Sequence, residues 1–321
     1  MERTAQDPFA AAPAFSSLRT PLITAPGAPD APWRAGLSPL TAPLPHFRRP
    51  AARRLCRGLM LTLGQCVAVE HRERLAAVPE PAIFALNHRN RIEALLAPTV
   101  LIYLRHGAPL HFLADWMFLE TPGLGWLLRQ GEPIAVYNKP ARFRWRDGFR
   151  RERLRRPVLD ACLEQLARGE SVGIFPEGTR NHDNGRLLRG RLGLGELALR
   201  AAGVPVVPVA IKYPGADIRR APAGALVGRA PAGALPHMVL SIGEPLDCAA
   251  ERLQLAAAPD ARRELARRVV DRVMAALAAE LGKDYKRGVP RLATGGRGSD
   301  GRQSRHSLLV EAGAKHGSEA T

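Results

Sequence analysis

The sequence predicts an α/β fold with a mostly parallel sheet flanked by helices. Between residues 81 and 281, short apolar runs that are typical of buried strands alternate with longer segments of helical periodicity. Gly and Pro residues separate many of these segments, as expected at turns. Hydrophobic residues make up 46% of the 321 residues, which is enough for a sizeable core. An amphipathic helical segment is expected to precede the sheet.

The amino-terminal part is expected to divide at residue 45. Residues 1–45 are rich in Ala and Pro and lack the pattern of a secretory signal, so we expect a disordered leader. Residues 46–75 contain a basic patch and then an apolar stretch at 58–69, which is too short to span a bilayer. This stretch is either an amphipathic helix lying in a membrane interface or a helix packed on the core, and one helix can do both. The patch consists of Arg48, Arg49, Arg53, Arg54 and Arg57.

The first half of the α/β region contains three expected strands. These strands lie at 81–86, 109–114 and 133–137, and helices are expected at 92–104 and 116–129. The sequence Thr-Pro-Gly at 121–123 should break or kink the second helix, because Pro removes a donor and clashes with the preceding turn.

The second half continues the alternation. Helices are expected at 158–166, 192–202 and 260–281, and strands at 171–175, 204–211 and 238–242. Gly169 is the expected cap after the first of these helices, and Asp260 the expected N-cap of the last. Residues 221–236 contain APAGAL twice and are expected to be a low-complexity loop, and 288–321 a disordered tail.

Charge and cysteine content narrow the class of protein. The net charge of +17 suits either nucleic acid or anionic lipid as a partner. Aromatic residues make up only 5% and show no stacking pattern, which disfavours single-strand nucleic-acid binding. The four cysteines are widely spaced, so neither a disulfide framework nor a zinc site is expected, and a reducing cytoplasmic setting fits best.

Two loops follow expected strands and carry residues suited to chemistry. Ligand sites in parallel sheets form where loops leave the carboxyl ends of strands. The first loop, 87–93, holds His88 and Glu93, and a carboxylate facing an imidazole can fix its tautomer and leave the other nitrogen free to take a proton from a hydroxyl. Taken alone, such a pair is more often a surface contact.

The second loop is Phe-Pro-Glu-Gly-Thr-Arg at 175–180. Gly178 allows close approach of a ligand to the backbone, and Thr179 and Arg180 offer a hydroxyl and a guanidinium to a phosphate. The alternative is a tight turn with a solvated arginine.

Together these loops resemble those of the glycerolipid acyltransferase family, which includes 1-acylglycerol-3-phosphate and glycerol-3-phosphate acyltransferases. That family shows Asn-His-x4-Asp, then a Gly-x-x-x-Val-x-Arg-like stretch, then Phe-Pro-Glu-Gly-Thr-Arg, and last an apolar Val-Pro-Val segment. The corresponding positions here begin at Asn87-His88 and continue at 131–139, 175–180 and 204–209. The resemblance covers about residues 80 to 245.

The resemblance implies a fold, a reaction and roles for individual residues. Residues 76–287 would form an acyltransferase domain, in which His88 is the general base on the acceptor hydroxyl and Glu93 orients it. The acceptor's glycerol and phosphate would contact Glu177, Gly178, Thr179 and Arg180. The donor would be acyl-CoA or acyl-acyl carrier protein, and no metal or redox cofactor is implied.

The acceptor and the location follow from the same resemblance. Lysophosphatidate is the expected acceptor, followed by glycerol 3-phosphate or another lysolipid such as an amino-acid lipid, in phospholipid biosynthesis. Because the products are lipids, the chain is expected to be cytoplasmic and peripheral on the inner face of the membrane, with an anionic surface as partner and no nucleic acid.

Two positions depart from the family pattern. Glu93 stands where the family usually has Asp, and Asn138 stands where it often has a phosphate-binding Arg. Lys139 could supply the missing charge, and Arg189 is a further candidate for anion binding, although a solvated arginine is the alternative there. These departures leave a second hypothesis, a catalytically impaired lipid-binding or regulatory homologue, and the charge leaves a third, a basic nucleic-acid-binding protein.

Overall fold

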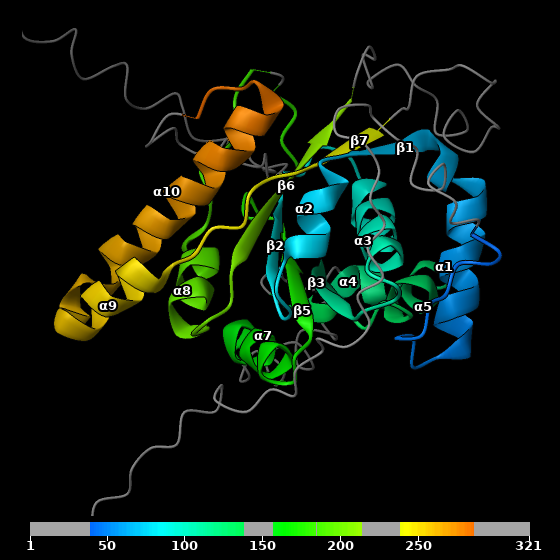
Figure 1. Ribbon diagram of the computed structural model, residues 1–321, viewed down its shortest axis with the longest axis horizontal. Coiled ribbons are helices and arrows are strands. Elements are labelled where there is room, and N and C mark those ends of the chain that lie inside the picture. Colours follow the sequence, from blue (N-terminus) through cyan, green and yellow to red (C-terminus); the bar gives the residue numbers. More distant parts are fainter. Residues whose placement is uncertain (1–38, 138–156, 184, 214–237, 286–321) are drawn as a thin grey trace, which may run out of the picture. The chain divides into compact units, whose positions relative to one another are not determined.

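The computed structural model describes residues 39–137, 157–183, 185–213 and 238–285 (Figure 1). The leader up to residue 38, Asn138 and Lys139, the APAGAL repeats and the expected tail lie outside the described residues. Ala42 and Leu44 are buried in the core, so the packed part of the chain begins before residue 46.

A seven-stranded sheet forms the centre of the described fold, in the order β1-β7-β6-β2-β5-β3-β4. All neighbouring strands are parallel except β6 and β7, which confirms the predicted mostly parallel sheet. The strands are β1 (Val67–Glu70), β2 (Ile83–Leu86), β3 (Leu110–Asp115), β4 (Ile134–Val136), β5 (Ser171–Ile174), β6 (Val206–Lys212) and β7 (Met238–Ile242).

Helices cover both faces of this sheet (Figure 1). On β2, Phe84 and Leu86 point into the core shared with α1 (Pro50–Thr62), α2 (Arg72–Ala77) and α3 (Glu93–Leu104). Ile83 and Ala85 point to the opposite face, as period-two alternation requires. That face is covered by α7 (Val158–Ala167), α8 (Leu192–Arg200) and α10 (Arg262–Leu281). The remaining helices are α4 (Trp116–Leu119), α5 (Leu124–Arg129), α9 (Ala249–Ala257) and the 3-10 turns η1 (Gly64–Cys66) and η5 (Pro259–Ala261).

One contact between helices depends on a glycine. A Cβ on Gly195 of α8 would lie 2.0 Å from the carbonyl oxygen of Ala266 on α10. The two helices therefore pack with their backbones close together, and α10 is held tightly over the sheet.

The structure corrects two sequence-based expectations. The apolar stretch 58–69 is not one helix, because α1 ends at Thr62 and Val67–Glu70 form β1, whose β-branched residues pair in parallel with β7. Asp260 is not the N-cap of the last helix, because it lies inside η5 and Ala261 takes the cap position. The break expected at 121–123 is confirmed, since it separates α4 from α5 and Gly123 has a φ of 72°.

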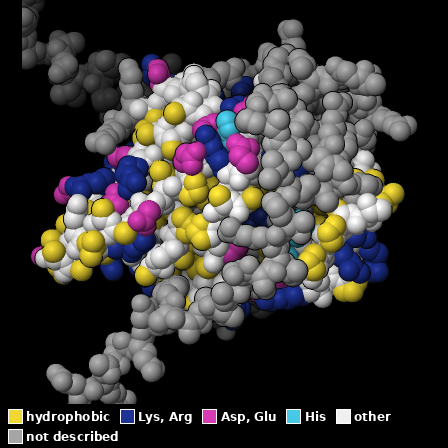
Figure 2. Space-filling model, in the orientation of Figure 1, with side chains coloured by type: hydrophobic (Ala, Val, Ile, Leu, Met, Phe, Trp, Pro, Cys, Tyr) yellow, Lys and Arg dark blue, Asp and Glu magenta, His cyan; other side chains and the backbone are white. Residues whose placement is uncertain are grey.

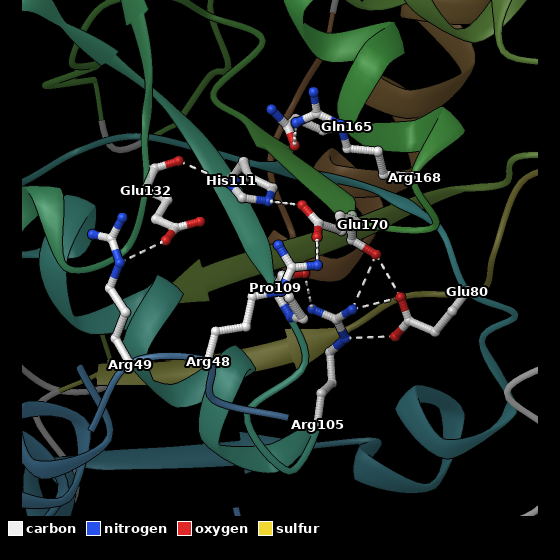
Figure 3. A network of polar contacts seen from close by, with 11 residues as sticks. Arg48, Arg49, Glu80, Arg105, Pro109, His111, Glu132, Gln165, Arg168 and Glu170 are labelled. Atoms are coloured by element: carbon white, nitrogen blue, oxygen red, sulfur yellow. Dashed lines mark hydrogen bonds and ion pairs between the residues drawn. The ribbon is translucent and has the colours of Figure 1, made fainter. Parts of the chain in front are cut away.

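A partly buried polar network joins the amino ends of the strands to the segment before α1 (Figure 3). The Arg105 guanidinium binds the Glu80 carboxylate through two nitrogens, at 2.7 and 2.5 Å, and also reaches Ser171. Both ring nitrogens of His111 face oxygen acceptors, Oε2 of Glu170 at 2.7 Å and the carbonyl of Glu132 at 2.8 Å. Arg48 and Arg49, which precede α1, bind Glu170 and Glu132. This network holds α1 to the edge of the sheet opposite the loops described next.

Candidate active site

Three loops meet at the carboxyl edge of the sheet because their strands are neighbours. β2 lies between β6 and β5, and all three run parallel. The loop after β2 carries His88, the loop after β5 carries 175–180, and Tyr213 directly follows β6. The sequence had predicted the first two loops to form the site, and their side chains and backbones are in contact.

The central pair is His88 and Glu93. Nδ1 of His88 lies 3.0 Å from Oε2 of Glu93, and the same oxygen accepts a hydrogen bond of 2.6 Å from the backbone N–H of Arg89. Glu93 is fully buried and is the first residue of α3, where the helix dipole stabilises a negative charge. A carboxylate facing Nδ1 selects the tautomer that carries its proton there, which leaves Nε2 as the basic nitrogen. No described residue hydrogen-bonds Nε2.

Glutamate in place of aspartate is therefore accommodated by the geometry. The longer side chain reaches the imidazole at a normal hydrogen-bond distance. Its other oxygen, Oε1, accepts a hydrogen bond of 2.5 Å from the hydroxyl of Tyr213. Burial beside the Glu93 carboxylate raises the pKa of Tyr213 well above its usual range, so the phenol stays protonated and donates.

Tyr213 did not emerge from the sequence as a site residue. The available signal was an aromatic residue with a polar tip directly after a strand that neighbours β2. Recognising it required the strand order, which the sequence does not give.

The loop that carries His88 is fixed to its surroundings on both sides. The Asn87 side chain donates to the carbonyl of Ile211 at 3.1 Å and accepts from its N–H at 2.6 Å, as a strand partner would. The His88 ring stacks on Phe175, with ring centroids 4.4 Å apart. The loop is thus held at Asn87 by β6 and at His88 by the residue that follows β5.

Glu177 links the two predicted loops from below the surface. Its carboxylate is fully buried and accepts from the backbone N–H of His88 at 3.2 Å and of Leu188 at 3.0 Å. Burial raises its pKa, although these hydrogen bonds act in the opposite direction. In addition, the N–H of Asn181 donates to the carbonyl of His88 at 2.7 Å. These contacts give Glu177 a role in holding the loops, while its contact with substrate stays a prediction.

The other predicted binding residues lie on the surface of the same edge. Gly178 has a φ of 61°, and a Cβ there would lie 2.3 Å from Nε of Arg191, so the sharp turn favours glycine. Thr179 is partly exposed, and Arg180 and Arg189 are exposed. Within the described part of the chain, neither arginine has a hydrogen bond or ion pair. Lys139 lies outside that part.

A lysine that the sequence did not single out lies close to these loops. Residues after α10 run beside the segment that follows the second loop, since Asp284 donates to the carbonyl of Gly185 and accepts from the N–H of Leu187. The ammonium of Lys283 donates to the carbonyl of Asp183 at 3.4 Å. Its pKa is lowered by burial and then by the Arg89 guanidinium, while nearby carboxylates, including that of Glu93, act in the opposite direction. The site thus carries a second pair of cations, Arg89 and Lys283.

Comparison with known proteins agrees with the sequence motifs. Residues 66–212 match the family model described as Acyltransferase. A lyso-ornithine lipid O-acyltransferase from Pseudomonas aeruginosa is 31% identical over 165 residues, which are 51% of this chain and 55% of the relative. The chloroplastic 1-acyl-sn-glycerol-3-phosphate acyltransferase LPAT1 from Arabidopsis thaliana is 26% identical over 149 residues, 46% of this chain and 36% of the relative.

The chain therefore spans between about a third and just over half of the length of these relatives. Among solved structures, the 1-acyl-sn-glycerophosphate (LPA) acyltransferase PlsC from Thermotoga maritima is similar, with a TM-score of 0.45 and 21% identity. That likeness covers 74% of this chain and 80% of the other.

Proposed function

We propose that this chain, which belongs to the glycerolipid acyltransferase family, transfers a fatty acyl group from a thioester donor to a hydroxyl of a lysolipid. The observation that carries the proposal is the contact of 3.0 Å between Nδ1 of His88 and the buried Glu93 carboxylate. It leaves Nε2 available as a general base at the edge where three loops meet.

In the proposed reaction, Nε2 of His88 takes the proton from the acceptor hydroxyl as its oxygen attacks the thioester carbonyl. The new C–O ester bond forms, the C–S bond breaks, and the proton on His88 passes to the departing thiolate. Glu93 stabilises the imidazolium that exists between these two proton transfers. The donor is acyl-CoA or acyl-acyl carrier protein, and no metal or redox cofactor takes part.

The proposed acceptor carries a charged head group. Arg89, Arg180, Arg189 and Lys283 bring four cationic side chains to the loops around His88, and a phosphate suits such a setting. We take lysophosphatidate as the first acceptor to test. Lyso-ornithine lipid is the second acceptor to test, because one relative is named as a lyso-ornithine lipid O-acyltransferase.

The proposed place of action is a membrane surface, on its cytoplasmic side. One face of α1 is buried at Ala52, Cys56 and Met60, so the helix packs on the core, and Arg53 and Arg54 on the other face are exposed. Figure 2 shows basic and hydrophobic side chains side by side at the right-hand edge, where Figure 1 places α1. Exposed apolar residues Leu61, Phe118, Leu124 and Trp126 supply groups that could enter an interface.

In the described part of the chain, no helix combines the length and apolar character needed to cross a bilayer. Peripheral attachment is tested by sedimentation with vesicles of neutral lipid and with vesicles containing anionic lipid. Binding to anionic vesicles that falls on Arg53→Glu and Arg54→Glu substitution would support it, and equal binding to neutral vesicles would contradict the charge argument.

The deciding experiment measures CoA release from oleoyl-CoA with and without lysophosphatidate, using a thiol-reactive dye. All four cysteines are buried, and burial raises the pKa of Cys56 and Cys162 to about 12, so the protein's own thiols contribute little signal. Release should require both the acceptor and His88. The matched controls are His88→Ala, which should abolish it, and His71→Asn, which removes an imidazole that is 44% exposed and should leave it intact.

A catalytically impaired lipid-binding homologue is the alternative. The His88–Glu93 distance supports the enzyme, because the carboxylate is already placed as the reaction needs. If lysophosphatidate, lyso-ornithine lipid and both donor types gave no His88-dependent release, the lipid-binding homologue would become the better description.

A further inference from the structure

We infer that Tyr213 is a positioning residue for the reaction proposed above, and that its hydroxyl holds Glu93 so that one carboxylate oxygen faces His88. The inference rests on the proposed function for its kinetic test, and on geometry alone for its spectroscopic test.

The two oxygens of Glu93 have separate partners. Oε2 accepts from His88 and from the backbone of Arg89, and Oε1 accepts from Tyr213 at 2.5 Å. The carboxylate is fully buried, so water does not replace a missing donor. Without the hydroxyl, the carboxylate would rotate to share its donors between both oxygens, and Oε2 would move away from Nδ1.

The position of Tyr213 is itself fixed. Its ring packs against the core on the α1 and α3 side of the sheet. Two residues earlier, Ile211 is bound through both its backbone groups to the side chain of Asn87. The end of β6 and the residue after it therefore bind the His88 loop at two points, Asn87 and Glu93.

Removing one hydroxyl tests this role. Tyr213→Phe keeps the ring and its packing and should lower kcat about tenfold, less than the roughly hundredfold expected for a displacement of about 1 Å. The KM for the acceptor should stay within about twofold, because the hydroxyl points to Glu93 and not to substrate. A rise in acceptor KM with an unchanged kcat would overturn the inference in favour of direct substrate contact.

A matched control separates positioning from stability. Tyr285 also donates to a carboxylate, Asp271, at 2.7 Å, and it is partly buried like Tyr213. Tyr285→Phe should therefore lower the free energy of unfolding by a similar amount but leave kcat unchanged. Equal losses of kcat in the two variants would mean that Tyr213 acts only through stability.

The dependence on Glu93 gives the sharpest kinetic test. In a Glu93→Asp background the shorter carboxylate cannot reach both Tyr213 and His88, so Tyr213→Phe should change kcat by less than about twofold. The same tenfold loss in both backgrounds would overturn the inference.

A readout without turnover keeps the two proposals distinguishable. In protein labelled with 15N-histidine, the hydrogen-bonded Nδ1 proton of His88 should be observed and should weaken or shift in Tyr213→Phe but not in Tyr285→Phe. If the wild type released no CoA yet this signal behaved as described, the proposed function would fail and the positioning role would stand. An unchanged signal in Tyr213→Phe would refute the positioning role whatever the activity.

Discussion

Replacing Glu177 by Gln separates a structural from a substrate-binding role for this residue. The two side chains have nearly the same shape, but the amide offers one acceptor oxygen where the carboxylate offers two. The backbone N–H groups of His88 and Leu188 now face different carboxylate oxygens at 3.2 and 3.0 Å. In the variant, one of these N–H groups would face an NH2 group, donor against donor.

The magnitude follows from these contacts. A hydrogen bond to a charged acceptor contributes about 1.5–3 kcal/mol, and a buried donor left unpaired costs about 1–3 kcal/mol. Burying the carboxylate charge is unfavourable and raises the pKa of Glu177, and the neutral amide avoids this cost, which offsets part of the loss. We therefore expect the free energy of unfolding to fall by about 2 kcal/mol. Because His88 loses its backbone anchor, kcat should also fall, by up to about a hundredfold for a shift of about 1 Å.

Two assays check this prediction together. Urea unfolding gives the difference in the free energy of unfolding, provided that the slope of this free energy against urea concentration is the same in both proteins. The control is Glu264→Gln, at a side chain that is 76% exposed, and no change is expected there. CoA release gives kcat and the KM for lysophosphatidate. A rise in that KM with stability within about 0.5 kcal/mol of wild type would refute the structural reasoning and place Glu177 in contact with substrate.

Three further predictions test other parts of the structure. Burial raises the pKa of Glu177 above 4.5 in the folded protein, so between 4.5 and that pKa the folded protein holds a proton that the unfolded chain has lost. The free energy of unfolding of the wild type should therefore fall relative to that of Glu177→Gln as pH rises through this range. Urea unfolding at several pH values checks this, and a wild-type stability that rises relative to the variant would contradict it. Lys283→Met should raise the KM for lysophosphatidate about fivefold with little change in the KM for the donor, as expected for the loss of a partly exposed charge contact. CoA release at varied acceptor and donor concentrations measures both constants, and a change in the donor KM alone would place Lys283 at the donor instead of the acceptor. Gly195→Ala should cost about 2–3 kcal/mol, measured by urea unfolding, because its Cβ meets a backbone oxygen of α10, and a loss below about 0.5 kcal/mol would show that the helices can separate freely.

Features encoded in short stretches of sequence were the ones that could be predicted. The pair formed by His88 and Glu93 spans five positions, and the periodicity of each strand and helix is also local. Parallel neighbours then explain why the loops after β2 and β5 share one edge. The contact between loop residues His88 and Glu177 follows from that arrangement.

Features that depend on distant pairing could not be predicted in the same way. Tyr213 lies 120 positions after Glu93, and its role appears only once β6 is known to lie beside β2. Lys283 depends on a bridge between Arg186 and Asp284 that has no local pattern. β1 was missed because four residues next to an apolar helix carry too little periodicity to separate them from it.

The pairing of β1 with β7 also sets the order in which the chain can fold as it leaves the ribosome. β1 is an edge strand whose neighbour is β7, and Val67 aligns with Met238. β1 must therefore wait, with its apolar side chains unpaired, until residues 238–242 have been synthesised. The segment that follows the second loop waits longer still, because its partner Asp284 comes after α10. Nascent chains that end before residue 238 should thus need chaperones, and the site should form only after Asp284 has left the ribosome.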